Sequence, residues 1–353
     1  MAEPLRIGIT WEFLTEGAGL LDDVLPAVFG GYKGVEWEYM PQGNSRVIQP
    51  SEIGRYDALI ALHHVQIKPE SFEGVDRLAC IARWGVGYDL IDVPACTAND
   101  VALCITPDAV RRPVAEGVIG MILALSKHLL VKDRLTREGG WDKKTQYVGT
   151  CLADRVLGCV GMGNIGAEVV RLLQPFGMAR TLVYDPYLSP EKAAAAGVEL
   201  ADLDTVLRES DFVSIHCPLT KDTFHLLGKR ELGLMKRTAH LINCARGPIV
   251  DQVALTEALQ SGQIAGAGLD VYEKEPIAPD DPLLGMENVI ATPHGIVWTE
   301  ELFRDNGLIS CRNILAILRG DEPQNVVNRQ VVSQPGFQAK LRNLRDKWYT
   351  FNG

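Results

Sequence analysis

The sequence predicts an α/β protein that consists of two doubly wound parallel-sheet domains. Short apolar runs alternate with helical patterns along most of the 353 residues, and this alternation favours parallel strands covered by helices on both faces. A glycine-rich turn in the middle of the chain joins one apolar run to a helix, as in a βαβ unit. The last long helical pattern, Thr299–Arg319, is followed by no strand, so we expect it to cross back to the first domain. A chain of this length can bury two such cores.

Five apolar runs predict the strands of the first domain, and turn residues such as Pro41-Gln42-Gly43-Asn44 separate them. A long apolar helical pattern, Val110–Leu129, follows these strands. Because it is apolar on most sides, we expect it to be buried in the fold or against a partner subunit. A polar arm, Gly139–Gly149, comes next. The expected strands are Leu5–Ile9, Val35–Tyr39, Asp57–Leu62, Ala79–Arg83 and Val101–Ile105.

The glycine-rich turn Gly161-Met162-Gly163-Asn164-Ile165-Gly166 lies between the apolar run Val156–Val160 and a helical pattern. A second apolar run, Thr181–Tyr184, follows the helix and ends on Asp185. In such a turn the first glycine permits the tight bend, the second lets the backbone approach a pyrophosphate, and the third lets the helix pack on the sheet. A purely structural turn is the alternative. Strand, helix, second strand and acid together predict a dinucleotide site, and Asp185 is placed to bind ribose hydroxyls.

Asp185 also favours NAD over NADP. A carboxylate at this position repels a 2′-phosphate, and the following Pro186-Tyr187 supply no compensating cation.

The α/β pattern continues beyond Asp185 and stops at about Val331, after which the tail is basic with late aromatic residues. Expected helices are Asp202–Glu209, Lys229–Met235 and Asp251–Ser261, and expected strands are Asp211–His216, Thr238–Asn243, Ala265–Val271 and Val289–Thr292.

Composition excludes several classes of partner. The net charge is −10, and no basic run is long enough to indicate nucleic-acid binding. No apolar run is long enough to cross a bilayer, and the opening Leu5–Ile9 run, interrupted by Arg6, indicates a strand and not a signal peptide. The eight cysteines form no Cys-x-x-Cys pair, so we expect a reduced, cytoplasmic protein, and we expect no metal site.

Three residues at predicted strand ends carry chemistry that belongs together. They are Arg246 after one strand, Glu275 in the loop after the next, and His294 after the last. Each alone has an unremarkable alternative, such as a surface ion pair or a solvated acid. The carboxyl ends of parallel strands meet at one edge of a sheet, however. A histidine can donate a proton to a carbonyl, a carboxylate can hold its tautomer, and a guanidinium can bind an anion.

These motifs resemble the D-isomer-specific 2-hydroxyacid dehydrogenase family, and the resemblance extends to about Asn328. Two upstream stretches, Gly85-Val86-Gly87-Tyr88-Asp89 and Pro113-Val114-Ala115-Glu116, also resemble that family. The other matching motifs are Gly161–Gly166 with Asp185, His216-Cys217-Pro218-Leu219-Thr220, Asn243–Ile249, Gly268–Pro276 and Thr292-Pro293-His294. The resemblance implies a Rossmann dinucleotide-binding domain, residues 107–294, inserted into a flavodoxin-like substrate domain. That substrate domain is expected at residues 1–106 and 295–353, with a tail from about residue 331.

The resemblance also implies the activity, which is the NAD-dependent interconversion of a 2-keto acid and an (R)-2-hydroxy acid. Arg246 is expected to bind this small-molecule substrate, and His294 to be the acid/base paired with Glu275. Backbone N–H groups of Val86 and Gly87 are expected to hold the substrate carboxylate.

Further residues are implied on both sides of the reaction. His63, His64 and Trp298 are expected near the substrate, and Asp270 near the nicotinamide. The expected cofactor-binding residues are Gly161, Met162, Gly163, Asn164, Ile165, Gly166, Asp185, His216, Cys217, Pro218, Thr223, Cys244, Ala245, Asp270 and His294.

Two other functions stay open. Phosphite oxidation would use the same Arg, Glu and His with an oxyanion substrate, and a non-enzymatic NADH-sensing protein similar to the C-terminal-binding corepressors would retain the same motifs. Formate dehydrogenases are disfavoured, because they resemble this pattern but pair the histidine with Gln where this chain has Glu275. The apolar helix Val110–Leu129 and the arm after it resemble the dimer-forming elements of the family, so we expect a homodimer.

Overall fold

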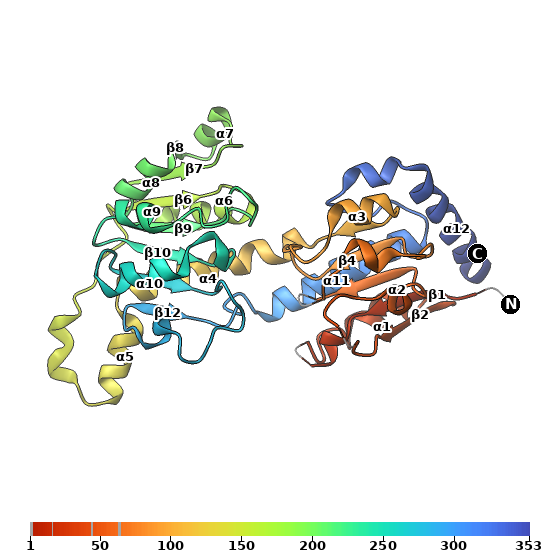
Figure 1. Cartoon of the computed structure of the whole chain (residues 1–353), viewed down its shortest axis with the longest axis horizontal. Coiled ribbons are helices and arrows are strands. Elements are labelled where there is room, and N and C mark those ends of the chain that lie inside the picture. The colour runs from red at the N-terminus through yellow and green to blue at the C-terminus, as the bar shows by residue number, and fades with distance from the viewer. Residues whose placement is uncertain (1–2, 16, 44, 63–64) are drawn as a thin grey trace. The chain divides into compact units, whose positions relative to one another are not determined.

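The computed structural model describes residues 3–15, 17–43, 45–62 and 65–353, and the chain forms two compact units (Figure 1). Unit 1 comprises Met1–Val110 and Thr299–Gly353, and unit 2 comprises Arg111–Trp298. The division therefore falls inside helix α4 (Pro107–Ser126) and directly before helix α11 (Glu300–Leu318).

Unit 1 is built on a five-stranded parallel sheet in the order β2-β1-β3-β4-β5, which is the strand order of flavodoxin-like folds. The strands match the predicted ones within a residue at each end. They are β1 (Leu5–Ile9), β2 (Val35–Tyr39), β3 (Ala58–Ala61), β4 (Cys80–Arg83) and β5 (Ala102–Cys104). Its helices besides α11 are α1 (Val24–Phe29), α2 (Pro50–Ile53), α3 (Val93–Ala98) and α12 (Pro335–Asn352).

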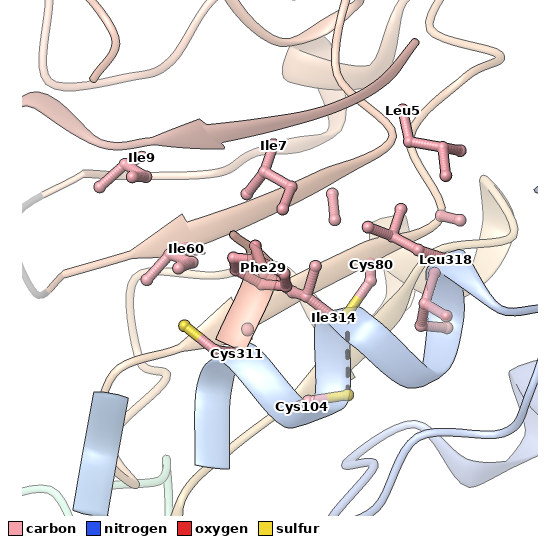
Figure 2. Packing of buried hydrophobic residues seen from close by; sticks show 14 of the residues in the cluster. Leu5, Ile7, Ile9, Phe29, Ile60, Cys80, Cys104, Cys311, Ile314 and Leu318 are labelled. Atoms are coloured by element: carbon pink, nitrogen blue, oxygen red, sulfur yellow. Dashed lines mark hydrogen bonds between the residues drawn. The ribbon is translucent and has the colours of Figure 1, made fainter. Parts of the chain in front are cut away.

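The final long helix, α11, packs in the core of unit 1. Figure 2 shows Cys311, Ile314 and Leu318 of α11 facing side chains of the sheet, among them Ile7 and Ile60. All five are fully buried. Thr299 caps the start of this helix, because its hydroxyl oxygen accepts a hydrogen bond from the Leu302 N–H. The apolar face of α11 is therefore buried against the sheet of unit 1.

The chain beyond Val331 shows no clear sequence pattern, yet the structure orders it. A 3-10 helix, η7 (Arg329–Ser333), leads into α12, whose apolar face is buried in the core of unit 1. This face consists of Phe337, Leu341, Leu344 and Trp348. They recur at helical spacing, but the basic residues between them obscure the stripe in a sequence reading.

Unit 2 is built on a seven-stranded parallel sheet in the order β12-β11-β10-β9-β6-β7-β8 (Figure 1). The predicted strands are confirmed within two residues at each end, and the short β8 was missed. The direction of strand order reverses between β6 and β9, which is where doubly wound sheets bind ligands. The strands are β6 (Val156–Val160), β7 (Arg180–Tyr184), β8 (Glu199–Leu200), β9 (Phe212–Ile215), β10 (His240–Asn243), β11 (Gly266–Leu269) and β12 (Val289–Ala291).

Short helices connect these strands, and the predicted ones are confirmed. Asp251 caps the start of α10, since its carboxylate accepts a hydrogen bond from the Ala254 N–H at 3.0 Å. The helices are α6 (Asn164–Leu173), α7 (Pro190–Ala195), α8 (Leu203–Glu209), α9 (Lys229–Leu234) and α10 (Gln252–Gln260).

The expected helix Val110–Leu129 is interrupted. Helix α4 ends at Ser126, His128 adopts a left-handed conformation with φ of 50°, and a separate helix α5 (Leu129–Arg137) follows. The polar arm after it contains a 3-10 helix, η3 (Trp141–Gln146). In the described part of the chain no single helix has the length and apolar character of a membrane span; α4 and α5 meet those criteria only as a pair bent by 59°.

The burial of α12 predicts that this helix contributes to the stability of unit 1. Replacing Leu341, which is 3 % exposed, by Ala should lower the free energy of unfolding by about 2–4 kcal/mol, because it leaves a cavity in the core. Urea unfolding followed by circular dichroism measures this change. Tyr349→Ala on the exposed side of the same helix is the matched control and should shift it by less than about 0.5 kcal/mol. Equal effects of the two variants would contradict the packing described here.

Candidate active site

The glycine-rich turn after β6 requires glycine at two of its positions for different reasons. Gly161 has φ of +96°, and a Cβ there would lie 2.7 Å from the backbone nitrogen of Cys217. A Cβ on Gly166 would lie 2.7 Å from the Gly161 carbonyl oxygen, so α6 packs tightly against the turn. Gly163 differs, since no atom lies within 4 Å of the position its Cβ would take. Its missing side chain leaves open space beside the turn, which fits the approach of a phosphate group.

Asp185, directly after β7, organises this turn. Its Oδ2 accepts a hydrogen bond from the Met162 N–H and its Oδ1 one from the Tyr187 N–H, both at 2.8 Å. Each carboxylate oxygen keeps a second lone pair for a ribose hydroxyl. The N–H groups in the first turn of α6, including those of Asn164 and Ile165, have no intrahelical acceptor. The carboxylate can bind a ribose and the helix N-terminus beside it can bind a phosphate, so the two together fit a dinucleotide.

The residues after β9 shape the neighbouring loop. The Thr223 hydroxyl donates to the Pro218 carbonyl at 2.6 Å and accepts from the Thr220 N–H at 2.7 Å, so Thr223 closes a turn. The ring of His216 packs against Gly166, where an added Cβ would lie 3.3 Å from the His216 Cδ2. Burial lowers the pKa of His216 to about 4 and raises the pKa of Cys217 to about 11, so both are uncharged at neutral pH.

The loop that carries Arg246 begins at Asn243, the last residue of β10. The buried Asn243 side chain accepts a hydrogen bond from the Ala245 N–H and donates one to the Arg246 carbonyl, each at 3.0 Å. The Arg246 Nη1 donates to the Ala245 carbonyl at 2.7 Å. The next residue must be glycine, because a Cβ on Gly247 would lie 1.9 Å from the carbonyl carbon of Tyr272. The Arg246 loop is thereby pressed against the loop that follows β11.

That second loop carries Glu275, and it brings Glu275 to His294. The Glu275 Oε2 lies 2.7 Å from the His294 Nδ1, and its Oε1 accepts a hydrogen bond from the Tyr272 N–H at 3.1 Å. Burial raises the pKa of Glu275, but these hydrogen bonds and the charges of His294 and Arg246 outweigh it and hold the pKa below its usual value. The carboxylate is therefore charged at neutral pH, and it is protonated only as the pH falls through that lowered pKa.

Asp270, the residue after β11, fixes the turn that presents His294. This carboxylate is 1 % exposed, and its Oδ1 accepts three hydrogen bonds, from the Thr292 hydroxyl at 2.6 Å, the Gly295 N–H at 3.0 Å and the Ile296 N–H at 3.1 Å. His294 itself has φ of 52°, a left-handed conformation that a non-glycine residue adopts only when it is held there. The structure thus shows a positioning role for Asp270, where the sequence indicates only a contact with the cofactor.

Cys244 is a buried thiol beside this network. Its Sγ lies 3.7 Å from the Met121 Sδ. Burial raises its pKa, and the nearby Asp270 carboxylate raises it further. The thiol therefore stays protonated, which excludes a thiolate nucleophile at this position.

The expected substrate-side residues are divided between the units. Val86 and Gly87 belong to unit 1, and within the described residues neither of their N–H groups has a hydrogen-bond partner. Trp298 belongs to unit 2, is half exposed and packs over Gly295. His63 and His64 lie outside the described residues. Among the residues that the structure does describe, no three His, Cys, Asp or Glu side chains gather to hold a metal ion.

Three positioning residues lie inside motifs identified in the sequence but were assigned no role there, namely Asn243, Gly247 and Tyr272. Asn243 is a polar residue at the end of an otherwise buried strand, where an apolar residue would fit, and this position could have indicated a hydrogen-bonding role. The need for glycine at 247 depends on a contact between two loops, which no local pattern reveals.

Comparison with known proteins agrees with this geometry. The model of the NAD-binding domain of D-isomer-specific 2-hydroxyacid dehydrogenases matches residues 119–295. A glyoxylate reductase of Korarchaeum cryptofilum is 42 % identical over 287 residues, which span 80 % of this chain and 86 % of that protein. A D-3-phosphoglycerate dehydrogenase of Archaeoglobus fulgidus is 36 % identical over 299 residues, 85 % of this chain and 56 % of that protein.

Solved structures show the same architecture. The D-lactate dehydrogenase from Aquifex aeolicus, complexed with NAD and lactic acid, superimposes with a TM-score of 0.78 at 27 % identity over 91 % of this chain and 99 % of that one. Sequence relatives, the match to the NAD-binding domain and the fold all agree, and the chain belongs to the D-isomer-specific 2-hydroxyacid dehydrogenase family.

Proposed function

We propose that this chain reduces a small 2-keto acid to the (R)-2-hydroxy acid with NADH, or catalyses the reverse reaction. The observation that carries the proposal is the 2.7 Å contact between the Glu275 carboxylate and the His294 ring, in the same unit as a turn that fits a dinucleotide. Its relatives named glyoxylate reductase support a substrate with a small side chain.

His294 is the proposed proton donor for the carbonyl oxygen. A charged Glu275 can only accept a hydrogen bond, so the His294 Nδ1 must donate to it. The Nε2 is then the atom that exchanges a proton with the substrate oxygen. The neighbouring negative charge stabilises the imidazolium that forms when the reverse reaction removes that proton.

Arg246 and the Val86-Gly87 turn are the proposed substrate-binding groups. The guanidinium of Arg246 polarises the carbonyl and attracts a carboxylate. In unit 1, the free N–H groups of Val86 and Gly87 are suited to a carboxylate oxygen. Asp185 and the first turn of α6 would hold the ribose and the phosphates of NADH, which would supply the hydride for the carbonyl carbon.

We further propose a cytoplasmic homodimer. Helix α5, the arm and the residues beside them, numbers 127–149, expose large apolar side chains: Leu129, Leu130, Trp141 at 67 % and Val148 at 79 %. A second copy of the chain is the proposed partner, because the same segment resembles the dimer-forming elements of the family. All eight cysteines are free thiols, which supports a reducing compartment.

The acid/base assignment predicts the behaviour of two variants. His294→Ala should lower kcat for glyoxylate or pyruvate reduction about 100-fold or more, because the carbonyl oxygen loses its proton donor. Glu275→Gln should lower kcat, because the imidazolium loses the neighbouring charge that stabilises it. Steady-state kinetics with NADH measures both effects.

His225→Ala provides the matched control for these variants. His225 also pairs with a glutamate in unit 2, with its Nε2 2.6 Å from the Glu273 Oε1, and this pair contains none of the proposed catalytic residues. This variant should leave kcat unchanged. Full turnover in His294→Ala would show that another group is the acid, whereas tight NADH binding without any turnover in the wild type would favour an NADH-sensing protein.

The position of Asp185 predicts the cofactor preference. Asp185→Asn removes the charge that repels a 2′-phosphate and keeps one acceptor oxygen, so it should raise kcat/KM for NADPH relative to NADH about tenfold. Asp185→Ala also removes the contact with Met162 and should weaken both dinucleotides. An unchanged preference in Asp185→Asn would contradict the assignment.

The exposed arm predicts the oligomeric state. Light scattering should give the wild type twice the chain mass of 38.7 kDa, and Trp141→Glu should reduce it to the single-chain mass, because a charge cannot be buried in an apolar interface. Val253→Glu on α10, also at an exposed apolar residue, should leave the dimer intact. A wild type with the mass of one chain would refute the proposal.

A further inference from the structure

The turn proposed to hold the substrate carboxylate depends on Gly85, which directly follows β4 and Trp84. Gly85 is buried and has φ of +111°, and an added Cβ would lie 3.0 Å from the Arg83 Nη1. Only glycine fits this conformation. The peptide groups of Gly85 therefore set the direction in which the N–H groups of Val86 and Gly87 point.

Thr106, two residues beyond the end of β5, holds both of them. The Gly85 N–H donates to the Thr106 hydroxyl oxygen at 2.8 Å, and the Thr106 N–H donates to the Gly85 carbonyl at 3.0 Å. Thr106 is 1 % exposed, so water does not compete for these groups. The N–H and the carbonyl of Gly85 are therefore both hydrogen-bonded inside unit 1. The following N–H groups, of Val86 and Gly87, are the ones that remain available within the described residues.

Asn306 on α11 orients the Thr106 hydroxyl. That hydroxyl donates to the Asn306 Oδ1, and Asn306 is also 1 % exposed. A threonine hydroxyl has a single proton, so donation to Asn306 leaves its lone pairs to face the Gly85 N–H. The adjacent Gly307 lets α11 approach this closely, since a Cβ there would lie 3.3 Å from the ring of Trp84.

We propose that Thr106, held by Asn306, is a positioning residue that presents the Val86 and Gly87 amides to the carboxylate of the substrate. This inference rests on the proposed function, since it assumes that a 2-keto acid binds these amides. Thr106 and Asn306 belong to unit 1, whereas the dinucleotide turn belongs to unit 2. The effect of this pair should therefore fall on substrate binding and not on NADH binding.

Thr106→Val tests the proposal, because valine has the shape of threonine but lacks the hydroxyl. Loss of the hydroxyl leaves two buried groups without a partner, the Gly85 N–H and the Asn306 Oδ1, and frees the turn to rotate. We expect KM for glyoxylate and the inhibition constant of oxamate to rise about tenfold, while kcat and the dissociation constant of NADH change little. Thr106→Ser keeps the hydroxyl and should restore both constants.

Two further variants separate positioning from stability. Asn306→Ala should raise the same two constants, and it serves where Thr106→Val does not fold. Thr97→Val removes a hydroxyl that donates to the Val93 carbonyl in α3 of the same unit, and it should lower thermal stability without affecting KM. Thr106→Val or Asn306→Ala with a lowered melting temperature but unchanged KM and oxamate inhibition would overturn the proposal.

Different measurements show whether this inference or the proposed function is wrong. If the wild type reduces no 2-keto acid, the proposed function is wrong. In that case oxamate binding to the NADH complex, measured by calorimetry, still decides the role of Thr106. Weaker oxamate binding in Thr106→Val supports the role, and equal binding in the wild type and the variant refutes it.

Discussion

The close contact between the loops after β10 and β11 is the constraint on which the candidate site depends. A side chain at Gly247 would overlap the backbone of Tyr272, so the backbone after Arg246 touches the loop that carries Glu275. Glu275 in turn holds the ring of His294. A larger residue at position 247 must push the two loops apart, and the guanidinium and the carboxylate then separate. One missing Cβ thus brings a guanidinium, a carboxylate and an imidazole together at the edge of the sheet.

A second kind of contact holds the loops of the candidate site. A short polar side chain at the carboxyl end of a parallel strand accepts hydrogen bonds from the loop that must be held. Asp185 holds the glycine-rich turn, Asn243 the Arg246 loop, Asp270 the His294 turn, and Thr106 the substrate-side turn. Most of these groups are buried, where a satisfied hydrogen bond is strong and an unsatisfied one is costly. The loops of the candidate site are therefore held in place by short polar side chains.

The sequence reading reached the strands, most helices and the dinucleotide turn, because hydrophobic periodicity and glycine spacing are local signals. The pairing of Glu275 with His294 was predicted from strand ends and from family resemblance, and the structure places these two side chains in contact. Helix α12 was missed because basic residues interrupt its apolar stripe. The roles of Gly247 and Asp270 depend on contacts between segments distant in sequence, which periodicity does not encode.

In the proposed function, this chain transfers a hydride from NADH to the carbonyl carbon of a 2-keto acid while His294 protonates the oxygen. Reduction of pyruvate with NADH deuterated at the transferred position of C4, followed by NMR and chiral analysis of the product, tests this most directly. We expect (R)-lactate with one deuterium at C2 and a solvent proton on the hydroxyl. A product without deuterium, or of the (S) configuration, would contradict it.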